Sequence, residues 1–320
     1  MNNTWIPVFF TISDDYAPYA AVAVRSLLHN ASPAYNYRIH IIHQGLSPES
    51  AANLKALETA NSQIVLTEMR ESLRGIEDCE QTKLRCDYFT LTIYFRLFLA
   101  DMFPEYDKGI YLDSDIVVPG DISQLYTLEL GDNLVGACHD YSIENVPPLV
   151  HYVEEAVGVP IWQYVNSGVL LMNLKAMRQT RFGERFLETL NRFHFNCLAP
   201  DQDYLNAMCA GKILYLDKTW DTMPQRGAAE IPNPGIVHYN LFDKPWCYDD
   251  IPYQEIFWDY ARRTPYNSLL RAQLDAYTQA QKAHDRQSME LMGQKALEIP
   301  EEPVTFRKMT EKGEQIRICF

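Results

Sequence analysis

This sequence of 320 residues has no closely spaced pair of cysteines. Its seven cysteines are odd in number, lie far apart and include no Cys-x-x-Cys motif. The pattern disfavours both a disulfide framework and a structural zinc site. We therefore expect reduced thiols in a cytosolic protein, at Cys79, Cys86, Cys138, Cys197, Cys209, Cys247 and Cys319.

The sequence also lacks a long apolar run and an excess of basic residues. No segment reaches the roughly 20 apolar residues of a membrane span, and the N-terminus lacks the basic region of a signal peptide. The formal net charge of −14 disfavours binding to nucleic acid or to an anionic membrane, because phosphates attract Lys and Arg. We expect a cytoplasmic protein without a membrane span, and peripheral association at the inner face of the membrane stays open.

A glycine-rich phosphate loop is missing as well. The first strand, Ile6–Ile12, leads through a polar turn into the helix Ala20–His29 without one, so the unit is not a dinucleotide-binding fingerprint. Strands and helices alternate after it, which predicts a parallel sheet. The length predicts one α/β domain at residues 1–250 and a mostly helical C-terminal appendage at residues 251–320.

Further elements follow from the hydrophobic periodicity and the turn residues. The expected strands are Arg38–Ile42, Gln63–Leu66, Leu134–Cys138, Val169–Leu174 and Lys212–Leu216. The expected helices of the appendage are Tyr253–Arg262 and Ser268–His284, followed by a short strand at Val304–Phe306.

Two carboxylates interrupt the apolar run Gly109–Val118. Asp113 and Asp115 lie two residues apart, so in a strand both side chains point to one face and can reach one ion. The aliphatic flanks are typical of a strand buried on both faces, where unpaired carboxylates are costly. A divalent cation at the carboxyl edge of the sheet removes this cost. A plain turn is the alternative, because Pro119 and Gly120 follow directly.

Other polar residues stand at comparable positions. Arg96 lies within the apolar helix expected at Leu91–Phe103, where it binds an anionic ligand or pairs with a buried carboxylate. Asp140 follows a buried strand, where an acidic residue either has a functional role or caps the following segment. Asn166 enters an apolar strand, which indicates close approach to a ligand or a plain turn.

Three residues in the later part of the chain add candidates. Asp201 lies at the start of a helix and is expected to cap it. His238 ends an apolar run, a place more typical of a packed histidine than of a ligand. Lys244 adds a cation on a turn.

Six short motifs occur in a specific order between Ile6 and Trp246, although each is weak alone. In this order the chain resembles glycosyltransferase family 8, which includes glycogenin and bacterial lipopolysaccharide galactosyltransferases and glucosyltransferases. The motifs lie at Asp14–Tyr19 (Asp-Asp-Tyr-Ala-Pro-Tyr), Tyr94–Arg96, Tyr111–Asp115 (Tyr-Leu-Asp-Ser-Asp), Asn166–Leu174, Asp201–Asn206 and His238–Trp246 (His-Tyr through Lys-Pro-Trp).

The resemblance implies a GT-A fold, which is Rossmann-like with helices on both faces of a mostly parallel sheet. It also implies a UDP-glucose or UDP-galactose donor held through Mn²⁺ on its diphosphate. Asp113, Asp115 and His238 match the metal ligands of the family. Two carboxylates and an imidazole suit Mn²⁺ better than Mg²⁺, which is the alternative.

The resemblance extends to the other site residues. Lys244 and Arg96 would face the phosphates or the sugar, where the leaving group becomes more negative. Tyr16 matches the residue that stacks on uracil, and Asp140 matches a position near the acceptor. Further positions expected to contact the donor are Ser13, Asp14, Ser114, Asn166, Ser167, Asp201 and Gln202. The expected catalytic residues are Gln202, Asp201, Lys244 and Asp140.

The chain departs from the family pattern at two places. Relatives often have Asp where this chain has Ser13 and Asn where it has Asp15, which changes the uracil contacts. Relatives often have glycine at the position of Leu241, where a backbone amide meets the diphosphate.

The expected reaction is retaining transfer of a hexose to a glycan, glycolipid or glycoprotein acceptor, with an α-linked product. The matched sugar pocket supplies no clear nucleophile, so we expect a front-face route. In this route Lys244, Gln202 and the metal stabilise the ion pair. The appendage is the expected place of acceptor specificity.

Two other classes of protein stay open. The Asp-x-Asp run also resembles that of haloacid-dehalogenase-type phosphatases, in which the first Asp is the nucleophile. That motif normally lies on the first strand, whereas at least three strand candidates precede Asp113 here. A non-catalytic sugar-nucleotide-binding protein is the third class, and the presence of both acids, His238 and Lys244 disfavours it.

Overall fold

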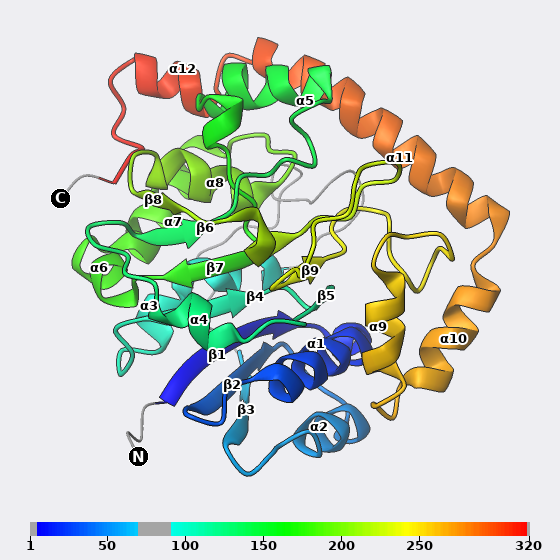
Figure 1. Cartoon of the computed structure of the whole chain (residues 1–320). Coiled ribbons are helices and arrows are strands. Elements are labelled where there is room, and N and C mark those ends of the chain that lie inside the picture. The colour runs from blue at the N-terminus through cyan, green and yellow to red at the C-terminus, as the bar shows by residue number, and fades with distance from the viewer. Residues whose placement is uncertain (1–4, 70–90, 319–320) are drawn as a thin grey trace.

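Seven strands form the main sheet of the computed structural model, which describes residues 5–69 and 91–318 (Figure 1). In chain order these strands are β1 (Trp5–Ile12), β2 (Asn36–His43), β3 (Ser62–Glu68), β4 (Gly109–Leu112), β6 (Val135–Ala137), β7 (Val169–Met172) and β8 (Ile213–Tyr215). Across the sheet their order is β3-β2-β1-β4-β7-β6-β8.

Most neighbouring strands of this sheet run parallel. β1 pairs in parallel with β2 and β4, β2 with β3, and β6 with β8. Only β7 opposes its neighbours β4 and β6 among the described strands of this sheet. The expected α/β architecture with a mostly parallel sheet is therefore confirmed.

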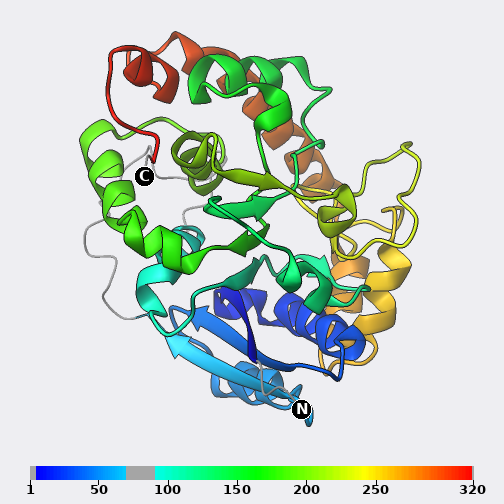
Figure 2. The same cartoon turned by 60° about the vertical axis from the view of Figure 1, so that its left-hand side comes forward.

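Helices cover both faces of the sheet (Figures 1 and 2). The side chains of β1 alternate between two hydrophobic clusters, with Phe9 in one and with Val8 and Phe10 in the other. All three side chains are buried, as expected for a central strand. The α-helices in the described ranges before residue 210 are α1 (Ala17–Asn30), α2 (Pro48–Lys55), α3 (Leu99–Met102), α4 (Ile122–Thr127), α5 (Pro147–Tyr152), α6 (Leu174–Gln179), α7 (Phe182–Phe193) and α8 (Pro200–Cys209).

The sequence predicted a single strand in the apolar run around the two carboxylates, and this prediction is wrong. The chain leaves the main sheet after β4, and Ile116–Val117 forms β5 in a separate two-stranded sheet. β5 pairs antiparallel with β9 (Val237–His238), and Ile116 lies opposite His238. The break places both carboxylates in a loop outside the sheet, which avoids burying them between its two apolar faces.

Local hydrogen bonding overrides three other expectations. The segment expected as one helix at Leu91–Phe103 is a 3-10 helix, Leu91–Phe98, followed by α3. The helix expected at Ser268–His284 is two helices, α10 (Asn267–Ala276) and α11 (Gln279–Glu298), because Thr278 forms a capping box with Gln281. The strand expected at Val304–Phe306 is wrong, because the Thr305 hydroxyl caps α12 (Phe306–Glu311).

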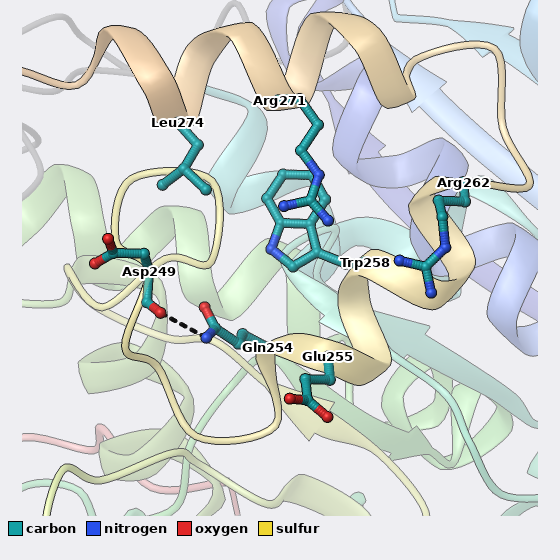
Figure 3. A pocket seen from close by; sticks show the side chains of 7 residues that line it. All are labelled: Asp249, Gln254, Glu255, Trp258, Arg262, Arg271 and Leu274. Carbon is teal, nitrogen blue, oxygen red and sulfur yellow. Dashed lines mark hydrogen bonds between the residues drawn. The ribbon is translucent and has the colours of Figure 1, made fainter.

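The C-terminal helices pack on the sheet domain. In α9 (Gln254–Ala261), the Tyr260 hydroxyl accepts a hydrogen bond from Asn30 at the end of α1, with 2.6 Å between Nδ2 and the hydroxyl oxygen. The guanidinium of Arg271 on α10 covers the Trp258 ring of α9 at 3.6 Å (Figure 3). α11 then runs along the outside of the molecule to α5 (Figures 1 and 2). A domain boundary between residues 250 and 251 stays a prediction.

Four of the seven cysteines lie in the described residues, and all four are buried free thiols: Cys138, Cys197, Cys209 and Cys247. The reduced state of the thiols stays a prediction, and Cys79, Cys86 and Cys319 lie outside the described residues. None of the described helices is both long and apolar enough to cross a membrane.

A buried carboxylate anchors the start of α8. Asp203 accepts hydrogen bonds from the hydroxyls of Tyr152 and Tyr164, both at 2.6 Å, and from the backbone N–H of Ala199 at 3.1 Å. Burial raises the pKa of Asp203 to about 6, although these hydrogen bonds work in the opposite direction. The network sets the position of the first turn of α8, which carries Asp201 and Gln202.

This raised pKa predicts a pH-dependent effect of Asp203→Asn. The folded wild type binds the Asp203 proton more tightly than the unfolded chain, so it loses stability as pH rises through about 4 to 6. Asparagine has no charge to bury. From pH 4 to pH 7, the difference in unfolding free energy between the variant and the wild type should therefore shift by on the order of 1–3 kcal/mol in favour of the variant. Urea unfolding at both pH values measures this gain, and a pH-independent difference contradicts it.

Candidate active site

A cavity of about 540 Å³ lies at the carboxyl ends of β1 and β4. Twelve of the fourteen site residues predicted from the sequence line it, and Asp14 and Asp140 do not. The twelve are Ser13, Tyr16, Arg96, Asp113, Ser114, Asp115, Asn166, Ser167, Asp201, Gln202, His238 and Lys244.

Asp113, Asp115 and His238 converge at the base of this cavity. One possible ligand atom from each residue lies within 4.8 Å of the others, a spacing that can hold a metal ion. Nε2 of His238 is 3.3 Å from Oδ1 of Asp115 and 3.9 Å from Oδ2 of Asp113. The pairing of β5 with β9 produces this convergence, because it brings residues far apart in the sequence to one point.

Asp221, which the sequence did not indicate, supports His238 from behind. Its carboxylate is fully buried, with Oδ1 3.0 Å from Nδ1 of His238. This contact favours a proton on Nδ1 and turns Nε2 toward the two carboxylates, as carboxylate partners of metal-binding histidines do. Burial lowers the pKa of His238, but Asp115 and Asp221 outweigh burial and raise it to about 10.

Lys244 provides positive charge beside Asp115. Its ammonium group forms an ion pair with Oδ2 of Asp115 and also donates to the backbone carbonyl of Tyr239. Burial works to raise the pKa of Asp115, but Lys244 and His238 hold it well below its usual value. The Asp115 carboxylate is therefore ionised, as a metal ligand must be.

Arg96 connects the carboxylates of the loop to α8. The guanidinium is buried, and it lies 2.8 Å from Oδ1 of Asp113 and 3.2 Å from Oδ2 of Asp201. It also donates to the carbonyl and the hydroxyl of Ser167 and covers the ring of Tyr111. Of the two predicted roles, the described contacts show pairing with carboxylates, of which Asp201 is buried and Asp113 is partly exposed.

Asp201 and Gln202 form the other end of the cavity. The prediction that Asp201 caps α8 is wrong, because Ala199 occupies that position and the Asp201 carboxylate accepts from the Ser167 hydroxyl at 2.9 Å. Oε1 of Gln202 accepts from the Ser167 backbone N–H at 3.0 Å. Both side chains are therefore fixed by the turn that precedes β7.

Asp140 acts behind the cavity and not at its surface. Its buried carboxylate accepts hydrogen bonds from Nε2 of Gln202 at 2.9 Å, from Nδ2 of Asn166 at 3.2 Å and from the Ser142 hydroxyl. This arrangement orients the two amides that line the cavity.

The N-terminal strand–turn–helix unit forms the mouth. The ring of Tyr16 is 48% exposed and meets the ring of Tyr19 edge-to-face at 5.4 Å. Asp14 instead accepts from the backbone N–H and the hydroxyl of Ser47, so this carboxylate is engaged outside the cavity. Its neighbour Asp15 lines the cavity.

Leu241 stands where relatives often have glycine. Its φ of 57° lies in the left-handed region, which glycine adopts without steric cost. Leu241 thus adopts a backbone conformation that favours glycine, and it lines the cavity.

Several lining residues were missed by sequence reasoning. Tyr19 stacks on Trp246 at 4.0 Å. These two residues end the motifs Asp14–Tyr19 and His238–Trp246, in which only other residues were assigned a function. No local signal could have found the lining residues of the C-terminal helices, because only packing brings these helices to the cavity. They are Gln273, Tyr277, Asp285 and Ser288.

A family model described as glycosyl transferase family 8 matches residues 7–250, which is more than half of the chain. The chain belongs to glycosyltransferase family 8. The matched region contains the two carboxylates, His238 and Lys244. Membership of the family also removes the phosphatase alternative.

Individual relatives agree with this assignment. Glycosyltransferase GlyE of Streptococcus pneumoniae is 25% identical over 82% of this chain and 62% of its own length. A lipopolysaccharide 1,2-glucosyltransferase of Escherichia coli is 27% identical over 54% of this chain and 57% of its own length. The chain thus spans less than two thirds of either curated relative.

A solved structure supports the fold. The galactosyltransferase LgtC, in complex with donor and acceptor sugar analogues, is 25% identical and superposes with a TM-score of 0.65. The match covers 81% of this chain and 96% of LgtC. The expected GT-A architecture of this family 8 member, with its helical C-terminal region, is confirmed.

The geometry predicts that Gly168→Ala damages metal binding. A Cβ atom at Gly168 would lie 2.3 Å from Cε1 of His238 and 2.8 Å from Oδ2 of Asp113, so both side chains must move. We expect Mn²⁺ affinity to fall by at least about tenfold, as with other disturbances of ligand orientation. Titration calorimetry with Mn²⁺ measures the change.

Gly293→Ala is the matched control. No atom lies within 4 Å of a Cβ there, and alanine favours a helix by roughly 0.5–1 kcal/mol over glycine. Equal Mn²⁺ affinity of Gly168→Ala and Gly293→Ala would contradict the prediction.

Proposed function

We propose that this protein transfers a hexose from UDP-glucose or UDP-galactose to a glycan, glycolipid or glycoprotein, with retention of the α configuration. The observation that carries the proposal is the convergence of Asp113, Asp115 and His238 beside Lys244 in one cavity. Membership of family 8 supports a sugar donor as the ligand for this cavity. A cytoplasmic location, with peripheral association at the inner face of the membrane, stays a prediction.

The donor set fits a divalent cation. Two carboxylates and one imidazole favour Mn²⁺, with Mg²⁺ as the alternative. A cation bound by Asp113, Asp115 and His238 would neutralise the diphosphate and make UDP a better leaving group.

Lys244 has a separate part in the reaction. In the observed geometry its ammonium group forms an ion pair with Asp115. A diphosphate held by a metal ion on Asp115 would therefore lie beside this ammonium group. As the glycosidic bond breaks, negative charge grows on the leaving oxygen, and a neighbouring ammonium group stabilises that state more than the ground state.

The end of the cavity at Asp201 and Gln202 favours retention of the anomeric configuration without a covalent intermediate. A double displacement needs a free carboxylate on the face of the sugar opposite the leaving group. The Asp201 carboxylate is held by Arg96 and Ser167, and the Asp140 carboxylate lies behind Gln202 and Asn166. Gln202 offers a neutral amide dipole, so a front-face route on which the acceptor proton passes to the leaving oxygen fits these contacts.

The proposal predicts that UDP binding depends on a divalent metal. Calorimetry should show tight UDP binding in Mn²⁺ and at least about tenfold weaker binding in EDTA. Asp115→Asn should abolish transfer and remove this dependence, because one ligand charge is lost. Asp132→Asn, at an exposed loop position, is the control that should behave like wild type. Full activity of Asp115→Asn in EDTA would refute the metal assignment.

The second prediction concerns the product. Proton NMR of the newly formed glycoside should show the α anomer when an α-linked UDP-hexose is the donor. Gln202→Ala should slow transfer without abolishing it, since the amide stabilises charge but forms no bond. A β-linked product, or a glycosyl adduct trapped on Asp201, would exclude the front-face route. Absence of both transfer and UDP-hexose hydrolysis would favour a non-catalytic binding protein.

A further inference from the structure

A second cavity, of about 410 Å³, lies between α9 and α10 (Figure 3). α9 contributes Gln254, Glu255 and Trp258 to its lining, and α10 contributes Arg271 and Leu274. Among the described residues, none lines both this cavity and the active site. The ligand of this second cavity is therefore independent of the proposed function.

The indole nitrogen of Trp258 points into this second cavity. Only 4% of Trp258 is exposed, and in Figure 3 its nitrogen faces the space between Leu274 and Gln254. Within the described ranges no residue accepts a hydrogen bond from this nitrogen. An indole N–H can only donate, and buried donors are normally hydrogen-bonded. The cavity therefore offers one directed donor to a ligand.

The guanidinium of Arg271 is a second donor beside the indole. It lies over the Trp258 ring at 3.6 Å and forms no ion pair in the part of the chain that the structure describes. A guanidinium that lies over a ring can still direct its N–H groups, which lie in its own plane, at a carboxylate. The two neighbouring donors thus suit one anionic group of a ligand.

Two carboxylates line the same cavity. Asp249, which precedes α9, and Glu255 are both exposed, and neither forms an ion pair with a described residue. Together with Arg262 and Arg271 they give the lining two negative and two positive side chains. A phosphate dianion would be repelled by the carboxylates. A ligand with one carboxylate and one ammonium group finds a partner for each charge.

We propose that this cavity binds a small zwitterion, an α-amino acid with an apolar side chain. The ligand carboxylate accepts hydrogen bonds from Arg271 and the Trp258 indole, and the ligand ammonium group faces the carboxylates of Asp249 and Glu255. Leu274 points into the cavity and contacts the apolar side chain (Figure 3). A volume of about 410 Å³ accommodates such a ligand. An α-hydroxy acid shares the carboxylate, so the experiment separates the two.

The test titrates ¹⁵N-labelled protein with L-leucine, L-valine and L-methionine, and follows the indole N–H signals by NMR. The chain has five tryptophans, and Trp258→Phe identifies the signal of Trp258. Three further probes each change one feature: L-leucinamide lacks the carboxylate, the α-hydroxy acid analogue of leucine lacks the ammonium group, and inorganic phosphate is a simple anion. Calorimetry gives the affinity of each probe.

The three amino acids should shift the Trp258 signal to saturation. The other three probes should bind at least about tenfold more weakly, because each leaves charged groups of the cavity without a partner. Unchanged positions of the remaining indole signals show that the protein, or a variant of it, keeps its fold.

Variants test the two charged ends of the ligand separately. Arg271→Gln should weaken L-leucine binding at least about tenfold. Joint replacement of the two exposed carboxylates, Asp249→Asn with Glu255→Gln, should lower the ratio of L-leucine affinity to hydroxy-acid affinity by at least about tenfold. Arg286→Gln is the control, because Arg286 is exposed on α11 and does not line the cavity, and it should behave like wild type.

Four results would overturn the inference. They are no saturable shift of the Trp258 signal, L-leucinamide binding as tight as L-leucine binding, phosphate binding as tight as L-leucine binding, and an affinity ratio that the joint replacement leaves unchanged. Hydroxy-acid binding tighter than L-leucine binding would also overturn it and would assign an α-hydroxy acid to the cavity.

Discussion

The need to neutralise buried charge at the carboxyl end of β4 organises this structure. Arg96 is buried, and removing a guanidinium from water is compensated only when carboxylates lie close to it. Its contacts with Asp113 and Asp201 tie the loop after β4 to the start of α8, and Ser167 joins both to the turn before β7. The two ends of the cavity are therefore parts of one network.

A second set of charges lies beside this network. Asp115, Asp221, His238 and Lys244 form a chain of alternating charge in which each carboxylate contacts a cationic or cation-binding group. The antiparallel pair β5–β9 holds this chain together by hydrogen bonds between backbones, independently of any ligand. The same backbone pairing explains why Gly168 must lack a side chain, since the loop, β9 and the turn before β7 meet there.

The C-terminal helices complete the cavity. Residues before 250 supply Arg96, Lys244 and the carboxylates around them, whereas α10, α11 and the turn between them supply Gln273, Tyr277, Asp285 and Ser288. The anchoring of these helices through Trp258, Arg271 and Tyr260 makes them an integral part of the cavity wall.

The sequence by itself determined what depends on local pattern: the alternation of strands and helices, the carboxylates two residues apart, and the motif order that carries the family. It gave His238 a metal-binding role and Lys244 a phosphate-binding role only through that resemblance. Tertiary structure decided the split of the run around Asp113 into β4 and β5, the support of His238 by Asp221 and the approach of Asp285 to the cavity. These features depend on contacts between residues distant in the chain, which neither hydrophobic periodicity nor turn propensity encodes.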